Sequence, residues 1–193
     1  MRIISGIYKN RNINSPEVNG THPMGERERI ALFNMIGTEL KDATVLDAYA
    51  GSGALGIEAI SRGAKEVLFI DSSHAALRTT AENCMMLGIP EEKVAFYRGK
   101  VGAFYRKVIQ GMGTAADPRM AAAIETFPRE YDIVFADPPY DDFDYDDVCR
   151  LTKTIKDGGL LVLSHPDDAP DFPGFTLEKT RQYARAHISF YRK

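Results

Sequence analysis

The sequence contains few cysteines and no long apolar segment. Its two cysteines, Cys84 and Cys149, lack the partner spacing of a zinc site, and two thiols are too few for a disulfide scaffold. No run of about 18 uninterrupted apolar residues occurs, and the first residues do not have the pattern of an export signal. We therefore expect a cytoplasmic chain with reduced cysteines, no metal site and no membrane span.

The formal net charge of -3 disfavours an evenly basic nucleic-acid binder, but the charge is unevenly distributed. Residues 1–36 carry five basic and three acidic side chains, and residues 175–193 carry five basic and one acidic. Two interpretations fit this pattern equally well. The basic ends bind a polyanion while the acidic middle does something else, or both are ordinary solvated surface.

From residue 44 onward, short apolar runs alternate with helical stretches, which is typical of a mostly parallel sheet covered on both faces. Five strands are predicted, at 44–49, 66–70, 93–98, 131–136 and 160–164. Helices are predicted at 54–62 and 73–87, and the runs 175–180 and 185–191 predict a closing antiparallel hairpin. Residues 110–129 read as a surface insertion with a possible helical turn at 119–125.

Before the sheet, residues 2–13 alternate apolar and polar around Gly6 and predict a small hairpin. Residues 26–36 predict an amphipathic helix. Its expected apolar face consists of Ile30, Leu32, Phe33 and Ile36. We therefore divide the chain into an N-terminal extension, 1–37, and a sheet domain, 38–193.

A glycine-rich turn links the first predicted strand to a helix. Gly51, Gly53 and Gly56 satisfy the dinucleotide-binding pattern, and Asp71 lies 20 residues after Gly51, where an acid would bind a ribose. A nicotinamide cofactor must therefore be considered, as must a purely structural turn. Asp47 argues against the dinucleotide, because its carboxylate would repel a pyrophosphate.

S-adenosylmethionine suits this turn better, because it has no phosphate and carries an ammonium and a sulfonium that favour a nearby carboxylate. Asp71 would accept hydrogen bonds from the ribose hydroxyls, and the adenine would lie near residues 98–101. Many such enzymes have an acid there, whereas this sequence has Lys100. The residues assigned to the cofactor are Asp47, Tyr49, Gly51, Gly53, Leu55, Asp71, Ser72, Lys100 and Val101.

The fourth predicted strand runs into Asp137-Pro138-Pro139-Tyr140, at the sheet edge where ligands bind in open parallel sheets. An exocyclic base amine is a poor nucleophile, and acceptors directed at its hydrogens free its lone pair. The Asp137 carboxylate and the Pro138 carbonyl suit that role, and Tyr140 can stack on the base. The alternative is a turn that merely ends a strand. The acidic run 141–147 reads as a helix N-terminus.

With these motifs located, the chain resembles the RsmD family of small-subunit ribosomal RNA guanine-N2 methyltransferases over nearly its whole length. The matching residues are Arg2-Ile3-Ile4-Ser5-Gly6, Lys9, Arg11, Arg27, Arg29, Leu32-Phe33-Asn34, Asp47, Ala50 to Gly56, and Asp137-Pro138-Pro139-Tyr140. The tetrapeptide is shared by amino-methyltransferases in general, including DNA adenine enzymes. The N-terminal block is the part that resembles this family in particular.

The resemblance implies a Rossmann-like methyltransferase sheet with a C-terminal hairpin, a guanine of 16S RNA as target and a partly assembled small subunit as substrate. It also implies that the N-terminal extension contacts RNA through Lys9, Arg11, Arg27 and Arg29. We expect a monomer. The sequence departs from the family at His22-Pro23-Met24-Gly25, where Arg-Pro-Thr-Thr is usual, at Lys100 and around Arg119.

Two other functions stay open at this point. One is an adenine-N6 methyltransferase acting on DNA or RNA with the same tetrapeptide, which the lack of a separate DNA-reading domain disfavours. The other is a noncatalytic RNA-binding assembly factor, which an intact set of Asp47, Asp71 and Asp137 disfavours.

Overall fold

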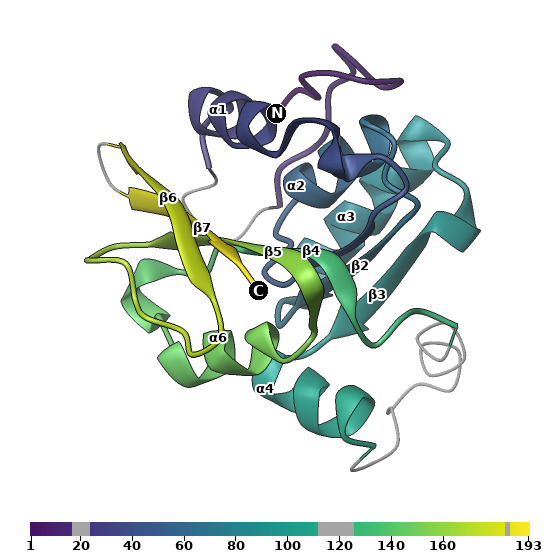
Figure 1. Ribbon diagram of the computed structural model, residues 1–193. Helices are drawn as coiled ribbons and strands as arrows, with labels where there is room; N and C mark the ends of the chain where they lie inside the picture. The colour runs from purple at the N-terminus through teal and green to yellow at the C-terminus, as the bar shows by residue number, and fades with distance from the viewer. Residues whose placement is uncertain (17–23, 112–125, 184–185) are drawn as a thin grey trace.

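A seven-stranded sheet runs through the molecule in the order β3-β2-β1-β4-β5-β7-β6 (Figure 1). The computed structural model describes residues 1–16, 24–111, 126–183 and 186–193. The strands are β1 (Thr44–Asp47), β2 (Glu66–Asp71), β3 (Val94–Arg98), β4 (Tyr131–Ala136), β5 (Ile155–His165), β6 (Thr176–Tyr183) and β7 (Ala186–Arg192). Strands β1 to β5 are parallel, and β7 is antiparallel to both of its neighbours. The predicted Rossmann-like sheet with its antiparallel C-terminal hairpin is confirmed.

Helices cover both faces of the sheet, and each face has its own core. In Figure 1, α1 (Glu26–Ile36), α2 (Ala54–Ser61) and α3 (His74–Leu87) lie on one face, and α4 (Val101–Phe104) and α6 (Tyr145–Thr152) on the other. Successive strand residues alternate between them, so Val45 packs in the first core and Leu46 in the second. The short helical turns are η1 (Gly37–Leu40), η2 (Glu91–Lys93), η3 (Tyr105–Ile109) and η4 (Tyr140–Asp142).

Most predicted bounds agree with the structure, and the differences have local causes. Strand β1 ends at Asp47 because the chain turns at Ala48. Strand β5 begins at Ile155, five residues before the predicted start, because Tyr131 pairs with Ile155 ahead of an irregularity in the ladder. The polar, glycine-containing run that follows Ile155 hid this pairing. The expected turn at 119–125 lies outside the described residues.

The acidic run before α6 begins a helix, as predicted. The Asp144 side chain accepts a hydrogen bond from the Asp147 amide at 3.2 Å and so caps the helix N-terminus. Asp147 in turn pairs with Arg150 at 2.7 Å. In the described part of the chain, no helix combines the length and apolar composition that crossing a membrane requires.

The N-terminal residues form less of a hairpin than predicted, and they dock on α2 instead. Arg2 and Asn12 make one isolated antiparallel bridge. The buried Glu58 carboxylate of α2 accepts hydrogen bonds from the amides of Ile4 and Ser5, at 2.6 and 3.0 Å. Gly6 has a positive φ of 81°, and a Cβ there would lie 1.7 Å from a backbone oxygen of α2. The glycine is therefore required by a close backbone contact.

Helix α1 has the predicted bounds, and Leu32, Phe33 and Ile36 of its predicted apolar face are buried, but Ile30 is not. Ile30 is 37% exposed, and Arg29 is buried with 1% exposure. The Arg29 guanidinium donates two hydrogen bonds to the carbonyl of Arg2, both at 3.2 Å. The prediction that Arg29 contacts RNA phosphate is therefore wrong, because a buried guanidinium cannot reach a polyanion. Arg29 instead ties α1 to the N-terminal residues.

Candidate active site

The turn between β1 and α2 is shaped by glycines with left-handed backbone. Gly51 has φ 56° and Gly53 has φ 78°. A Cβ at Gly53 would lie 2.5 Å from the Thr80 side chain of α3, whereas a Cβ at Gly51 would meet nothing within 4 Å. Gly53 is thus needed for packing within the protein. Gly51 leaves open space in which a ligand could approach the backbone.

Two strand-end carboxylates hold this turn. Asp71, at the end of β2, accepts hydrogen bonds from the amides of Gly51 at 2.9 Å and Ser73 at 2.8 Å. Asp47, at the end of β1, accepts one from the Gly56 amide at 2.9 Å. The predicted acids do meet at the glycine turn. They also organise it, and their carboxylate oxygens retain further acceptor capacity for a ligand.

Asp47 is an unfavourable place for a negative charge unless a cation is nearby. Asp47 is only 2% exposed. Burial raises the pKa of Asp47 to about 7, and the charges of Asp137 and Asp71 add to the rise. The hydrogen bond from Gly56 opposes it. A cationic ligand at this point would favour the ionised form. The site therefore suits the ammonium or sulfonium of S-adenosylmethionine and not a pyrophosphate.

Helix α3 supports the turn from behind with two buried polar side chains that the sequence analysis missed. The Thr80 hydroxyl donates to the carbonyl of Gly51 at 3.0 Å, and the Asn83 amide donates to the carbonyl of Ser52 at 2.9 Å. Both side chains are fully buried. A signal was present in the sequence, because polar residues at 80 and 83 interrupt the face that carries Leu77 and Leu87.

The other residues assigned to the cofactor surround the same edge of the sheet. Tyr49 is half-buried against the second core, and Leu55 and Val101 are buried. Ser72 and Lys100 are exposed, and Lys100 precedes the first residue of α4. Their contacts with a cofactor stay predictions.

The tetrapeptide follows β4 directly, next to β1, where the strand order reverses. The Tyr140 hydroxyl lies 2.6 Å from Ser164 Oγ near the end of β5, and the β4–β5 register places Ser164 beside Asp137. Burial raises the pKa of Asp137 to about 6; hydrogen bonding by Ser164 opposes this rise, and the charge of Glu28 adds to it. Because the charge of Asp137 also raises the pKa of Asp47, the tetrapeptide and the glycine turn form one electrostatic site.

Glu28, in the first turn of α1, belongs to this site although the sequence analysis gave it no role. Its charge contributes to raising the pKa of Asp137, Tyr140 and Tyr183. Tyr183 is the last residue of β6, and Figure 1 shows the start of α1 near that end of the hairpin. Neither Glu28 nor Ser164 has a motif around it, so no sequence signal marks them.

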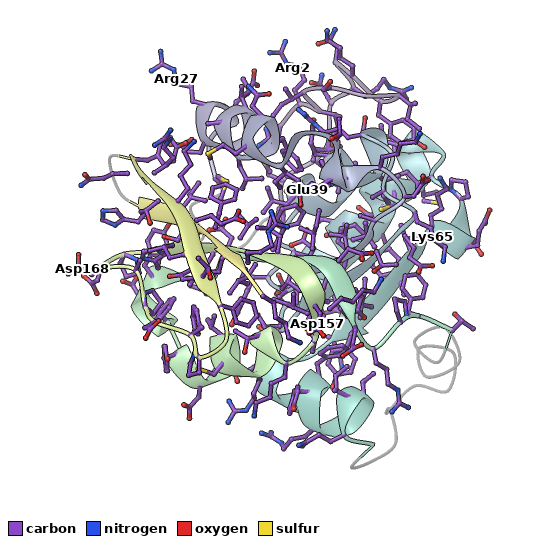
Figure 2. The ribbon with its side chains drawn as sticks, viewed as in Figure 1. Arg2, Arg27, Glu39, Lys65, Asp157 and Asp168 are labelled. Carbon is purple, nitrogen blue, oxygen red and sulfur yellow. The ribbon has the colours of Figure 1, made fainter. Side chains whose placement is uncertain are left out.

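The basic residues assigned to RNA differ in their placement. Lys9, Arg11 and Arg27 are exposed, and Figure 2 shows Arg27 pointing away from α1. They are placed where a polyanion could reach them, unlike the buried Arg29. Within the described residues, no group of three or more His, Cys, Asp or Glu side chains is arranged to bind a metal.

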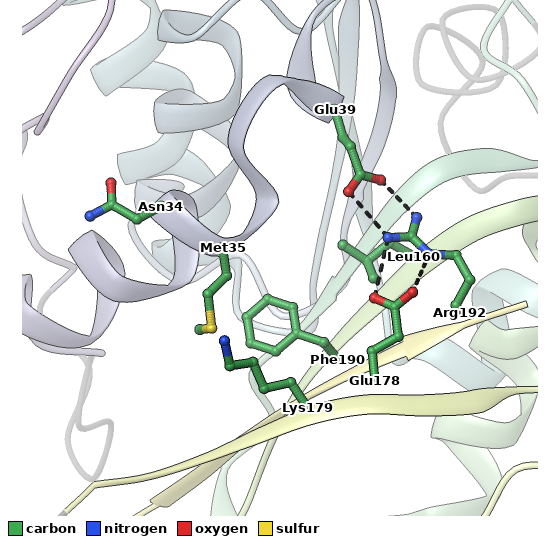
Figure 3. Close-up of a pocket in the computed structure, with 8 residues that line it drawn as sticks. All are labelled: Asn34, Met35, Glu39, Leu160, Glu178, Lys179, Phe190 and Arg192. Carbon is green, nitrogen blue, oxygen red and sulfur yellow. Dashed lines mark hydrogen bonds and ion pairs between the residues drawn. The ribbon is translucent and has the colours of Figure 1, made fainter.

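A separate hollow of about 300 Å³ lies between α1, η1 and the hairpin β6–β7 (Figure 3). There Arg192 pairs with Glu39 at 2.7 Å and Glu178 at 2.9 Å. In the β5–β7 ladder, Arg192 pairs with Leu160, four residues before Ser164. This hollow is therefore not the catalytic edge. Its ion pairs connect η1, which follows α1, to the hairpin and so help to fix α1 over the site.

A family profile described as "Conserved hypothetical protein 95" matches residues 1–192. The chain belongs to this family, the RsmD family. YlbH of Bacillus subtilis, a candidate rRNA methyltransferase, is 27% identical over 100% of this chain and 99% of its own length. Ribosomal RNA small subunit methyltransferase D of Escherichia coli is 31% identical over 72% of this chain and 60% of its own length.

Solved structures share the fold of this RsmD-family chain. YhhF of Escherichia coli, a candidate methyltransferase, superposes with a TM-score of 0.81 at 24% identity, over 100% of this chain and 97% of that one. SMU.776, a candidate methyltransferase solved with SAH, has a TM-score of 0.66 at 10% identity, over 89% of this chain and 50% of that one. These likenesses show the fold alone.

Proposed function

We propose that this chain transfers the methyl group of S-adenosylmethionine to the exocyclic N2 of a guanine in 16S rRNA. One observation carries the proposal: β1 and β4 are paired neighbours, so Asp47 at the end of β1 and Asp137 just after β4 lie at the same edge of the sheet, where the charge of Asp137 raises the pKa of Asp47. One carboxylate favours a cation, and the other can accept from an amine. Membership of the RsmD family supports an rRNA substrate.

In this proposal the cofactor half binds by charge and by backbone approach. Asp47 would hold the ammonium, Asp71 would accept from the ribose hydroxyls, and the open space at Gly51 would admit the ligand. When bound, S-adenosylmethionine supplies the methyl group. The half-buried Tyr49 and the residues around Lys100 would border it.

In the target half, the protein's task is to orient a weak nucleophile. Asp137 and the Pro138 carbonyl would accept the two amine hydrogens, which frees the nitrogen lone pair. Consecutive prolines fix this backbone and present no competing N–H. Tyr140 would stack on the base, as aromatic platforms do for extruded bases. After transfer, Asp137 or water would take the proton.

The N-terminal extension, 1–37, would bind RNA phosphate through Lys9, Arg11 and Arg27, which are exposed. A partly assembled small subunit would be the substrate, and a cytoplasmic monomer would act on it. Arg29 has no direct part in this binding, because it is buried.

Two assays test the proposal. Calorimetry should show S-adenosylmethionine binding to the purified chain. Incubation with 30S particles that lack the modification, followed by nucleoside analysis, should yield N2-methylguanosine. Formation of N6-methyladenosine, or tight RNA binding without any transfer, would refute it.

A further inference from the structure

Ser164 stands beside the tetrapeptide because of the sheet register. Ala136 of β4 pairs with Leu163 of β5, so the next residues along the two parallel strands, Asp137 and Ser164, lie next to each other at the carboxyl edge. Ser164 is 2% exposed, and its neighbour across the ladder is Ile188 of β7. A buried hydroxyl at this position must satisfy its hydrogen bonds within the site.

Donor and acceptor counting assigns those hydrogen bonds. The register puts Ser164 beside Asp137, and Ser164 lowers the pKa of that carboxyl as a hydrogen-bond donor does. Since an ionised carboxylate only accepts, the single hydroxyl hydrogen of Ser164 would be donated to it. The Tyr140 hydroxyl, 2.6 Å from Ser164 Oγ, must then donate to a lone pair of Ser164. With Asp137 ionised, the bonds therefore run in one direction, from Tyr140 to Ser164 to Asp137.

We propose that Ser164 is a positioning residue that couples the stacking ring of Tyr140 to the amine acceptor Asp137. The inference rests on the proposed function for its catalytic meaning, although the hydrogen-bond relay itself does not depend on which base is methylated. Ser164 touches neither base nor cofactor in this account. It acts by fixing the position of the Tyr140 ring, and by keeping the Asp137 carboxylate ionised and oriented toward the amine.

The relay has two consequences for the reaction. A ring held through its hydroxyl keeps one orientation, so a base stacked on it presents its amine at one place. A carboxylate that receives a hydrogen bond stays ionised at lower pH, and only the ionised form accepts both from Ser164 and from an amine hydrogen. Loss of Ser164 should therefore impair both the orientation and the charge of the acceptor.

Titration of Asp137 tests the relay without any substrate. The chain would be labelled with ¹³C at aspartate carboxyl carbons, and the Asp137 signal followed by NMR as pH changes in wild type, Ser164→Ala, Tyr140→Phe and the double variant. In Ser164→Ala the pKa of Asp137 should rise by about one pH unit, because the donor is gone. Tyr140→Phe should raise it by less, since it only weakens that donor.

The double variant gives the sharpest result. If Tyr140 acts on Asp137 through Ser164, Tyr140→Phe has no further effect once Ser164 is Ala. Ser189→Ala is the matched control, since Ser189 is also a buried serine at this end of the sheet but bonds His165 and Thr180. An unchanged Asp137 titration in Ser164→Ala, or fully additive effects, would overturn the relay.

Kinetics then test its catalytic meaning. Ser164→Ala should lower kcat on 30S particles about 10-fold to 100-fold at pH 6 and less at pH 8, with the affinity for S-adenosylmethionine unchanged. Ser164→Thr, which keeps the hydroxyl, should restore the wild-type pH profile. A relay seen by NMR together with transfer to a different base would refute the proposed target and leave the relay standing. A uniform loss at every pH would refute the catalytic role of Ser164.

Discussion

The two halves of the site are built in different ways. In the cofactor half, Asp47 and Asp71 accept hydrogen bonds from backbone amides of the turn that they border. In the target half, Tyr140 bonds the Ser164 side chain of β5, and the charge of Glu28 of α1 raises the pKa of Asp137 and Tyr140. The first half is fixed by local backbone geometry. The second is fixed by the packing of β4 against β5, and its electrostatics also depend on α1.

Because of this difference, substitutions should affect cofactor binding and methyl transfer separately. A change in the target half should damage transfer while the cofactor still binds, because the glycine turn keeps its own hydrogen bonds. A change in the cofactor half should damage binding first. Both expectations follow from where the hydrogen bonds lie, so substitutions in each half can test them.

Asp137→Ala should have the largest effect. Removal of the proposed amine acceptor should lower kcat for methyl transfer at least about 1,000-fold, because the acceptor acts at the reacting nitrogen. The dissociation constant of S-adenosylmethionine should stay within about threefold, because the turn retains the bonds of Asp47 and Asp71. Single-turnover transfer and calorimetry would measure the two quantities.

Asp141→Ala is a matched control for that experiment, since Asp141 is an exposed acid four residues further along. It should leave both transfer and cofactor binding unchanged. Equal losses of transfer and cofactor binding in Asp137→Ala would show that Asp137 belongs to the cofactor half, contrary to the proposed division of the site.

The same difference explains what could be predicted from the sequence. The glycine turn, Asp47, Asp71 and the tetrapeptide are contiguous motifs at strand ends, and alternation of apolar runs predicted the strands that carry them. Ser164 has no motif, because its importance depends on the β4–β5 register. Arg29 was misread for a similar reason: sequence shows that a side chain is basic, but not that it will be buried and donate to a backbone carbonyl.

Asp47→Asn should have the next largest effect and act in opposite directions on binding and stability. Loss of the charge should weaken S-adenosylmethionine binding about 10-fold to 100-fold. The pKa of Asp47 is about 7 in the folded chain, well above its value of 3.8 when unperturbed, so ionisation costs stability increasingly as pH rises through this window. At pH 8 the variant should therefore be stabilised, on the order of 2 kcal/mol.

Calorimetric binding and thermal unfolding at pH 4 and pH 8 check both parts of that prediction. The gain in stability should be small at pH 4, where the folded chain holds the Asp47 proton and the unfolded chain, with a pKa of 3.8, holds it about 40% of the time. The asparagine oxygen can still accept from the Gly56 amide, so the turn should persist. Destabilisation at pH 8 would mean that the ionised carboxylate is paired already, contrary to this reading of the site.

Arg27→Ala should have a smaller effect, confined to the RNA side. Arg27 is exposed, so its loss should weaken binding to 30S particles a few-fold and reduce the salt slope by about one. The free energy of unfolding should not change. Lys65→Ala is a matched control, because Lys65 is also exposed but lies on the β2 side of the molecule, away from α1 (Figure 2). Equal losses of binding to 30S particles in both variants would show only a general effect of net charge.

Glu28→Gln should have the smallest effect and tests how the target half is assembled. The Glu28 charge helps to raise the pKa of Asp137, so its removal should lower that pKa and move the acid limb of the pH–rate profile to lower pH. Near pH 6 transfer should then rise by up to about twofold. Glu26→Gln is the control, since Glu26 is in the same helical turn but pairs with Arg2 at 2.6 Å. A Glu28→Gln profile that matches both Glu26→Gln and wild type would mean that α1 does not contribute to the electrostatics of the catalytic edge, and the target half would then be built by β4 and β5 alone.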